Sequence, residues 1–88
     1  MKTLLVFTQS EEDCIWCKRF NPVLDSLEAE GVIIEKVYAF TSEGKHNPLN
    51  KTWDVKSTPT TIVLKDGIEV SRFLSAKPKS YVLEQLKD

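Results

Sequence analysis

The sequence predicts a single α/β domain of 88 residues, in which a βαβ unit and a ββα unit build one four-stranded mixed sheet flanked by about three helices. Three observations carry this prediction. A short apolar run precedes an amphipathic segment with helical periodicity. Two segments rich in β-branched residues flank an Asp-Gly pair, which is typical of a tight hairpin. Finally, 88 residues leave no room for a second packed core, because domains typically contain about 100–150 residues.

The first apolar run and the segment behind it predict a buried strand followed by a helix. Leu4–Phe7 is apolar on both faces and too short for a helix, as in a central parallel strand covered on both sides. From Cys14 to about Glu30, apolar residues recur at the spacings of one helix face, with charged residues on the other face. The apolar positions are Phe20, Val23, Leu24 and Leu27.

Capping signals mark both ends of this helix. Asp13 is the expected N-cap, and Gly31 stands where a helix commonly stops in a left-handed conformation. Pro22, inside the segment, should kink the helix. Val32–Phe40 is rich in β-branched and aromatic residues and is the expected second strand, so the connection is a right-handed βαβ crossover.

A short helix is predicted after the polar loop Thr41–Lys45. Asn47 is its expected N-cap and Pro48 its first residue. One face of this helix carries a stripe of Leu49, Thr52 and Trp53. We expect Trp53 to pack in the core.

The last third of the chain predicts a hairpin and a helix. Thr60–Lys65 and Ile68–Phe73 are the two strands, and Asp66–Gly67 is the turn between them. Pro78 begins the last helix, which covers the sheet with one apolar stripe. This stripe consists of Val82, Leu83 and Leu86.

The composition excludes several function classes. The chain carries 12 Lys and Arg against 13 Asp and Glu, a net charge of -1, so no strong field is available to hold nucleic acid or an anionic membrane. No segment approaches the roughly 20 apolar residues of a membrane helix, and Leu4–Phe7 is shorter than the core of a signal peptide. We therefore expect a soluble monomer in a reducing compartment, most simply the cytoplasm, with neither nucleic acid nor membrane as a partner.

The two cysteines, Cys14 and Cys17, are the residues most suited to chemistry. A bridge across so short a loop constrains little of the unfolded chain, so it cannot be a stability staple. A zinc site needs four ligands, and His46 is the only other soft or imidazole ligand in the sequence. A packed core pair is the other alternative. We favour redox chemistry and expect His46 to be solvated only.

The place of this pair at the start of a helix suits thiol–disulfide exchange. A helix N-terminus carries unpaired N–H groups and a partial positive charge, which favour a thiolate over a thiol. Cys14, at the outer end of the first turn, is the expected nucleophile. Cys17 lies one turn deeper, shielded from solvent, and is the expected resolving thiol, which attacks a mixed disulfide formed on Cys14.

Four segments resemble the thioredoxins in order and spacing, namely Cys14–Lys18 with its CxxC-Lys motif, Pro22, Thr58–Thr60 ahead of a strand, and Lys65–Gly67 in the hairpin. None is specific alone, but the combination is, and the resemblance covers nearly the whole chain. The chain begins at the strand before the motif and lacks the extra strand and helix of full-length thioredoxins. The resemblance therefore implies a thioredoxin-like fold in a minimal form, which is also similar to the glutaredoxins.

The resemblance implies roles for several positions. Pro59 is implied to be a cis-proline that faces the cysteines, which leaves the backbone of Thr58 free to pair with an extended client segment. Trp16 is implied to cover the disulfide and contact partners, and Lys18 to add positive charge beside the thiolate. Leu74–Ala76 stands where thioredoxins have a glycine on the substrate-facing loop, and Ser75 is implied to be a substrate-binding residue there. The plain alternatives are a proline that begins a strand, a half-exposed tryptophan and a solvated lysine.

The chain also departs from both family patterns. Asp13 stands where thioredoxins usually have Trp and follows Glu11 and Glu12, so three carboxylates oppose thiolate formation unless they form only a solvated acidic loop. Lys2–Thr8 lacks the buried acid thought to assist proton transfer to the deeper cysteine, which leaves that work to water or a loop carboxylate. The Cys-Pro-Tyr-Cys and Gly-Gly-x-Asp-like segments of glutaredoxins are absent, which favours protein dithiol exchange over glutathione use.

The implied function is that of a thiol–disulfide oxidoreductase that reduces protein disulfides, with ribonucleotide reductase among the candidate clients. No cofactor is expected to be bound, because the redox group is the Cys14–Cys17 disulfide itself. Electrons come from an NADPH-linked thioredoxin reductase or, in the alternative, from glutathione. Two other classes stay open. One is a binding subunit whose surface around Trp16 and Pro59 docks a larger enzyme, with redox incidental, and the other is a metal or iron–sulfur centre held between two chains by two CxxC pairs.

Overall fold

The computed structural model describes residues 1–40 and 43–87. Its elements in chain order are β1 (Lys2–Thr8), α1 (Ile15–Ala29), β2 (Ile34–Tyr38), α2 (Leu49–Thr52), β3 (Thr60–Lys65), β4 (Ile68–Leu74) and α3 (Lys79–Leu86). The strand order is β2-β1-β3-β4, with β1 parallel to β2 and antiparallel to β3, and with β4 antiparallel to β3. This confirms the predicted four-stranded mixed sheet with a βαβ and a ββα unit.

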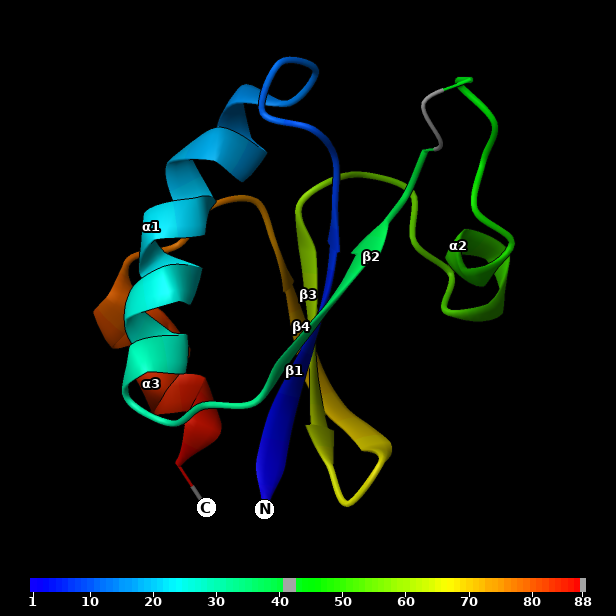
Figure 1. Cartoon of the computed structure of the whole chain (residues 1–88). Coiled ribbons are helices and arrows are strands. Elements are labelled where there is room, and N and C mark those ends of the chain that lie inside the picture. Colours follow the sequence, from blue (N-terminus) through cyan, green and yellow to red (C-terminus); the bar gives the residue numbers. More distant parts are fainter. Residues whose placement is uncertain (41–42, 88) are drawn as a thin grey trace.

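Different helices cover the two faces of the sheet (Figure 1), with α1 and α3 on one side and α2 on the other. Side chains alternate along β1, so Leu4 and Val6 face α1 and α3, whereas Leu5 and Phe7 face the α2 side. Trp53 packs against this second cluster, as predicted. The other members of the first cluster are Phe20, Leu24, Leu27, Val63, Phe73 and Val82, and Ile62 completes the second.

The C-terminus of α1 follows the prediction. Gly31 adopts a left-handed conformation with φ of 93°, and its N–H donates to the carbonyl of Glu28 at 3.0 Å. The N–H of Val32 donates to the carbonyl of Leu27, also at 3.0 Å. Two carbonyls of the last turn are thereby satisfied before the chain enters the sheet. Pro22 lies inside α1, which extends beyond it on both sides.

β2 is shorter than the strand predicted over residues 32–40. Before its start, the N–H of Val32 donates to the carbonyl of Leu27 in α1 and is not available to the sheet. Beyond its end, Phe40 pairs with His46 in an isolated bridge, and their rings lie 4.6 Å apart. His46 is exposed as expected, but its ring packs on another side chain rather than being solvated only. The polar loop predicted over 41–45 includes residues 41–42, which lie outside the described residues.

α2 begins at Leu49, one residue later than the sequence predicts, with Pro48 rather than Asn47 as its N-cap. Pro48 has helical backbone angles, with φ of -56° and ψ of -25°, and the side-chain oxygen of Asn47 accepts the N–H of Leu49 at 2.9 Å. The predicted apolar stripe is wrong in part, because Leu49 and Thr52 are exposed and only Trp53 packs against the sheet.

The predicted stripe of α3 is also wrong at one position. Val82 is fully buried and Leu86 packs against the first core cluster, but Leu83 is 39% exposed. Residues four apart lie one above the other on a helix, whereas the next residue along is rotated by about 100°. The pair Val82 and Leu86 therefore defines the buried face, and Leu83 falls outside it.

A β-bulge in β4 brings two charged residues to one face of the sheet. On β3, the partners Ile62 and Leu64 are two residues apart, whereas on β4 the corresponding partners Arg72 and Glu69 are three apart. Val70 is the extra residue. In a regular strand, residues three apart would point to opposite faces. The bulge thus permits an ion pair that a regular strand would forbid.

This ion pair ties β4 to the segment that follows α2. Arg72 donates to both carboxylate oxygens of Glu69, at 2.6 and 2.8 Å, and to the carbonyls of Trp53 at 2.9 Å and Asp54 at 3.2 Å. The hydrogen bonds from Arg72, opposed by partial burial, hold the pKa of the Glu69 carboxyl below its ordinary value. The same bonds raise the pKa of Arg72.

Replacing Glu69 by Gln should lower the free energy of unfolding at pH 7 by about 0.5–1 kcal/mol, because one partner of a two-bond ion pair is lost. The lowered pKa means that the carboxylate stabilises the fold fully above its ordinary value of 4.5 and that this contribution is lost as the pH falls. Urea unfolding of the oxidised protein should therefore show a difference between wild type and Glu69→Gln at pH 7 that vanishes in acid. Glu84→Gln, at the exposed pair with Lys87, is the matched control and should change little. An equal loss for Glu69→Gln at both pH values would contradict this account.

Candidate active site at the start of α1

A tight turn sets the position of the first cysteine. The carbonyl of Ser10 accepts the N–H groups of both Asp13 and Cys14, each at 3.1 Å, and the Ser10 hydroxyl donates to the Asp13 carboxylate at 2.9 Å. The Asp13 side chain is therefore occupied within the turn and does not cap α1. The prediction that Asp13 is the N-cap is wrong, because Asp13 belongs to this turn and the N-cap is the next residue, Cys14.

Cys14 is the N-cap of α1. Its backbone is extended, with φ of -144° and ψ of 98°, and its Sγ accepts the N–H of Cys17 at 3.2 Å. This is the usual bond from an N-cap side chain to the N–H three residues on, made by sulfur where Ser, Thr or Asp would use oxygen. The sulfur is thus aimed at the positive end of the helix dipole.

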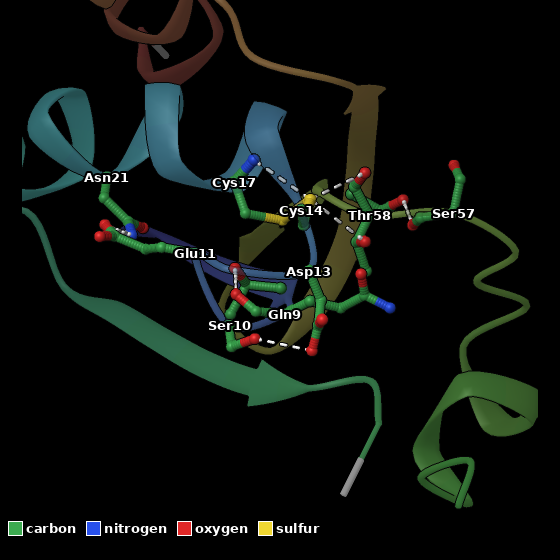
Figure 2. The surroundings of a disulfide bond; sticks show 11 residues. Gln9, Ser10, Glu11, Asp13, Cys14, Cys17, Asn21, Ser57 and Thr58 are labelled. Atoms are coloured by element: carbon green, nitrogen blue, oxygen red, sulfur yellow. Dashed lines mark hydrogen bonds between the residues drawn. A yellow bond between two sulfur atoms is a disulfide. The ribbon is translucent and has the colours of Figure 1, made fainter. Parts of the chain in front are cut away.

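The two cysteines form a disulfide across this first turn, with their Cα atoms 5.2 Å apart. Cys14 is 8% exposed and Cys17 is 1% exposed. Figure 2 shows the Cys14 sulfur between the N–H of Cys17 on one side and Thr58 on the other. Of the two residues, Cys14 is the one that retains contact with solvent.

The acids before the motif have partners of their own. Glu11 accepts a hydrogen bond from the side-chain amide of Asn21 at 2.7 Å, and Asp13 is held by Ser10. Figure 2 shows the Glu11 side chain reaching toward Asn21, away from Cys14. The first turn of α1 itself contains no acidic residue. Sequence reasoning missed Asn21 because its contact spans ten residues and no local pattern signals it.

The segment before β3 forms the opposite wall of the site. The Thr58–Pro59 peptide bond is cis, and Pro59 is buried. The carbonyl oxygen of Thr58 lies 3.7 Å from the Cys14 sulfur, and the Thr58 hydroxyl lies 3.6 Å from it as a donor. In the described part of the chain, neither the N–H nor the carbonyl of Thr58 makes a hydrogen bond to another backbone group. The hydroxyl contact, which joins residues 44 apart, was not predicted.

Two further contacts hold this wall in place. The Thr60 hydroxyl donates to the carbonyl of Ser57 at 2.6 Å, and the N–H of Ser75 donates to the carbonyl of Pro59 at 2.9 Å. Ser75 has φ of 68°, in the left-handed region that favours glycine. The loop therefore keeps a glycine-type conformation although a serine occupies it.

The remaining site residues predicted from the sequence lie on the outer surface of α1. Trp16 is 48% exposed, and the Arg19 guanidinium carbon lies 4.9 Å from its ring centroid, a cation–π contact. Lys18 is exposed. Arg19, which was not predicted, therefore lies against one face of the Trp16 ring.

The described part of the chain has neither a cluster of metal-ligand side chains nor a membrane-spanning helix. Among residues 1–40 and 43–87, no three His, Cys, Asp or Glu side chains come together as a group that could hold a metal ion. In the same residues, no helix has the length and apolar character needed to cross a membrane.

Comparison with known proteins gives concordant matches. The family model described as a thioredoxin-like domain matches residues 1–88. A thioredoxin of Chlamydia caviae is 40% identical over 74 residues, which are 82% of this chain and 69% of that protein. A thioredoxin of Mycolicibacterium smegmatis is 36% identical over 76 residues, covering 85% of this chain and 68% of that protein.

Solved structures match in fold. A mutant thioredoxin from Halobacterium salinarum superposes with a TM-score of 0.81 at 18% identity, over 96% of this chain and 70% of that chain. Thioredoxin NaTrxh from Nicotiana alata gives a TM-score of 0.79 at 24% identity, over 97% of this chain and 70% of that chain. At these identities the likeness concerns the arrangement of the backbone.

Replacing Ser75 by Gly should raise the free energy of unfolding by up to about 1 kcal/mol. A left-handed conformation costs an L-residue roughly 1–2 kcal/mol, and the greater freedom of glycine in the unfolded chain offsets about 0.5–1 kcal/mol of the gain. Ser80→Gly, in α3, is the matched control and should instead destabilise the protein by about 0.5 kcal/mol. Thermal unfolding of both variants checks this, and a Ser75→Gly protein no more stable than Ser80→Gly would contradict it.

Proposed function

Because the chain belongs to the thioredoxin-like domain family and is a thiol–disulfide oxidoreductase, we propose that it reduces disulfides of client proteins, with Cys14 as the attacking sulfur and Cys17 as the resolving sulfur. The observation that carries the assignment is the hydrogen bond from the N–H of Cys17 to the Cys14 sulfur. Negative charge on Cys14 is stabilised by this donor and by the helix end, whereas Cys17 lies behind it, almost without solvent contact.

In the first step, the Cys14 thiolate attacks one sulfur of the client disulfide. A new S–S bond forms between Cys14 and the client, the client's own S–S bond breaks, and its second sulfur leaves as a thiolate. The Thr58 hydroxyl, which lies 3.6 Å from the Cys14 sulfur, is a second donor to that sulfur while it carries charge. Glu11 and Asp13 are held by Asn21 and Ser10, which limits their opposition to the thiolate.

In the second step, Cys17 loses its proton and attacks the Cys14 sulfur. The Cys14–Cys17 bond forms, the mixed disulfide breaks, and the first client sulfur leaves as a thiolate. The client has then gained two electrons and, with protons from solvent, two thiols. The disulfide in the structure is the oxidised product of this sequence.

Electrons return to the pair from an NADPH-linked thioredoxin reductase in this proposal. The support is that the similar curated proteins are thioredoxins and that Ser71–Ser75, at the end of β4 and just beyond it, differs from the segment with which glutaredoxins grip glutathione. We place the reaction in a reducing compartment, the cytoplasm, since a lone short-loop cysteine pair serves exchange rather than stability.

Two single substitutions separate the roles of the cysteines. With dithiothreitol as donor, the wild-type protein should reduce insulin disulfides, and Cys14→Ser should abolish the activity because no nucleophile remains. Cys17→Ser should instead accumulate the mixed disulfide with insulin, because the attack proceeds and the resolving step cannot. Non-reducing electrophoresis reads out the trapped species. Activity of Cys14→Ser equal to that of wild type, or trapping by Cys14→Ser rather than Cys17→Ser, would contradict the assignment.

Thr58→Val should slow alkylation of Cys14 in the reduced protein at pH 7 by roughly three- to tenfold. Valine keeps the shape of threonine but removes the hydroxyl donor, and a hydrogen bond to a charged group contributes about 1.5–3 kcal/mol when its geometry is good and less at this length. Thr58→Ser keeps the donor and is the matched control. Rates with iodoacetamide, followed by mass spectrometry, check the effect. If Val and Ser variants react at the same rate, the hydroxyl plays no part.

A further inference from the structure

A single hydrogen bond fixes where the first of the three acidic residues before Cys14 places its charge. Nδ2 of Asn21 donates to Oε2 of Glu11 at 2.7 Å, across ten residues of chain. Asn21 lies in the second turn of α1 and is half-buried, whereas Glu11 lies in the exposed turn ahead of the helix. Figure 2 shows the two side chains meeting beside the helix, with the Glu11 carboxylate directed away from the Cys14 sulfur. The bond therefore ties a charge of the loop to a fixed point along α1.

Without this bond, the Glu11 carboxylate has a competing position at the start of the helix. The first N–H groups of a helix have no acceptor within it and carry a partial positive charge, which attracts a nearby carboxylate. The turn closed by the Ser10 carbonyl keeps Glu11 beside this helix end, only three residues ahead of the N-cap Cys14. The Cys14 sulfur uses the same helix end through the N–H of Cys17. A carboxylate placed there would compete with the Cys14 thiolate for the helix field and would repel it.

The other charged groups around the site do not depend on Asn21. In the loop before Cys14, Asp13 is bonded to the Ser10 hydroxyl at 2.9 Å, and Glu12 is exposed. The charged side chains of the neighbouring elements are Lys18, Arg19 and Asp25 of α1, Glu43 and Lys45 after β2, Asp54 and Lys56 before β3, and Lys77 before α3. Most of these are engaged in ion pairs or ring contacts. Glu11 is bonded to α1 itself, so its placement depends on one side chain of the helix.

We propose that Asn21 is a positioning residue for thiol–disulfide exchange, which keeps the Glu11 carboxylate away from the helix end that stabilises the Cys14 thiolate. The inference rests on the proposed function, because it takes the Cys14 sulfur as the attacking group. The fraction of thiolate sets the rate of attack at a given pH. Asn21 thereby makes an acidic loop ahead of the motif compatible with a reactive Cys14 at neutral pH.

The test is the pH dependence of Cys14 alkylation by iodoacetamide in the reduced protein, since the thiolate is the reacting form. In Asn21→Ala, the released carboxylate should move the midpoint of the profile to higher pH. Below that midpoint the reaction should slow roughly threefold, the size expected for one like charge several ångströms away and partly screened by water. Sodium chloride at about 1 M shortens the Debye length to about 3 Å, so it should reduce this difference. Asn21→Gln, which keeps an amide donor, should restore the wild-type profile.

A double variant assigns the effect to the charge of Glu11. Glu11→Gln alone should match wild type, and Glu11→Gln combined with Asn21→Ala should also match it, because no carboxylate is left to release. Asp25→Asn, which removes an exposed carboxylate one turn beyond Asn21 on the same helix, is the matched control and should leave the profile unchanged. A slowing by Asn21→Ala that persists in the Glu11→Gln background, or an unchanged profile for Asn21→Ala, would overturn the proposal. Failure of the wild-type protein to reduce insulin disulfides would instead contradict the proposed function.

Discussion

The hydrogen bond from the N–H of Cys17 to the Cys14 sulfur is the contact on which the site depends. It makes the first cysteine the cap of α1, so one geometry satisfies a helix donor and holds the sulfur in the field of the helix end. The same spacing brings the second sulfur within bonding distance of the first. The three-residue separation of the cysteines therefore allows both the capping hydrogen bond of α1 and the disulfide.

The sheet places the segment before β3, with Thr58, beside that sulfur. β1 and β3 are adjacent in the sheet, so the chain that leaves β1 toward Cys14 and the chain that enters β3 through Thr58 meet at the same end. The bulge at Val70 adds to this arrangement, because it places Glu69 on the face of Arg72, whose guanidinium also donates to the carbonyls that follow α2. The segment that leads from α2 to Thr58 is therefore tied to β4 by the hydrogen bonds of Arg72.

Local chemistry made much of the fold predictable, and contacts between distant residues account for what was missed. The bounds of β3 and the Asp66–Gly67 turn follow from a dipeptide that tolerates positive φ, which both residues adopt. The cap of α1 was missed because Asp13 is a preferred N-cap residue type, but the turn closed by Ser10 places Cys14 at that position instead. The cysteine pair could be identified from its spacing, whereas the contact of the Thr58 hydroxyl with Cys14 and the hydrogen bond from Asn21 to Glu11 join residues that only the fold brings together.

The central claim is that the helix end and its capping bond distinguish two sulfurs only three residues apart. Partial alkylation of the reduced protein with limiting iodoacetamide at neutral pH, followed by peptide mapping, tests it most directly. The account predicts that nearly all of the first label is found on Cys14 and that Cys17 stays unmodified until the protein is unfolded. Equal labelling of the two cysteines, or faster labelling of Cys17, would contradict it.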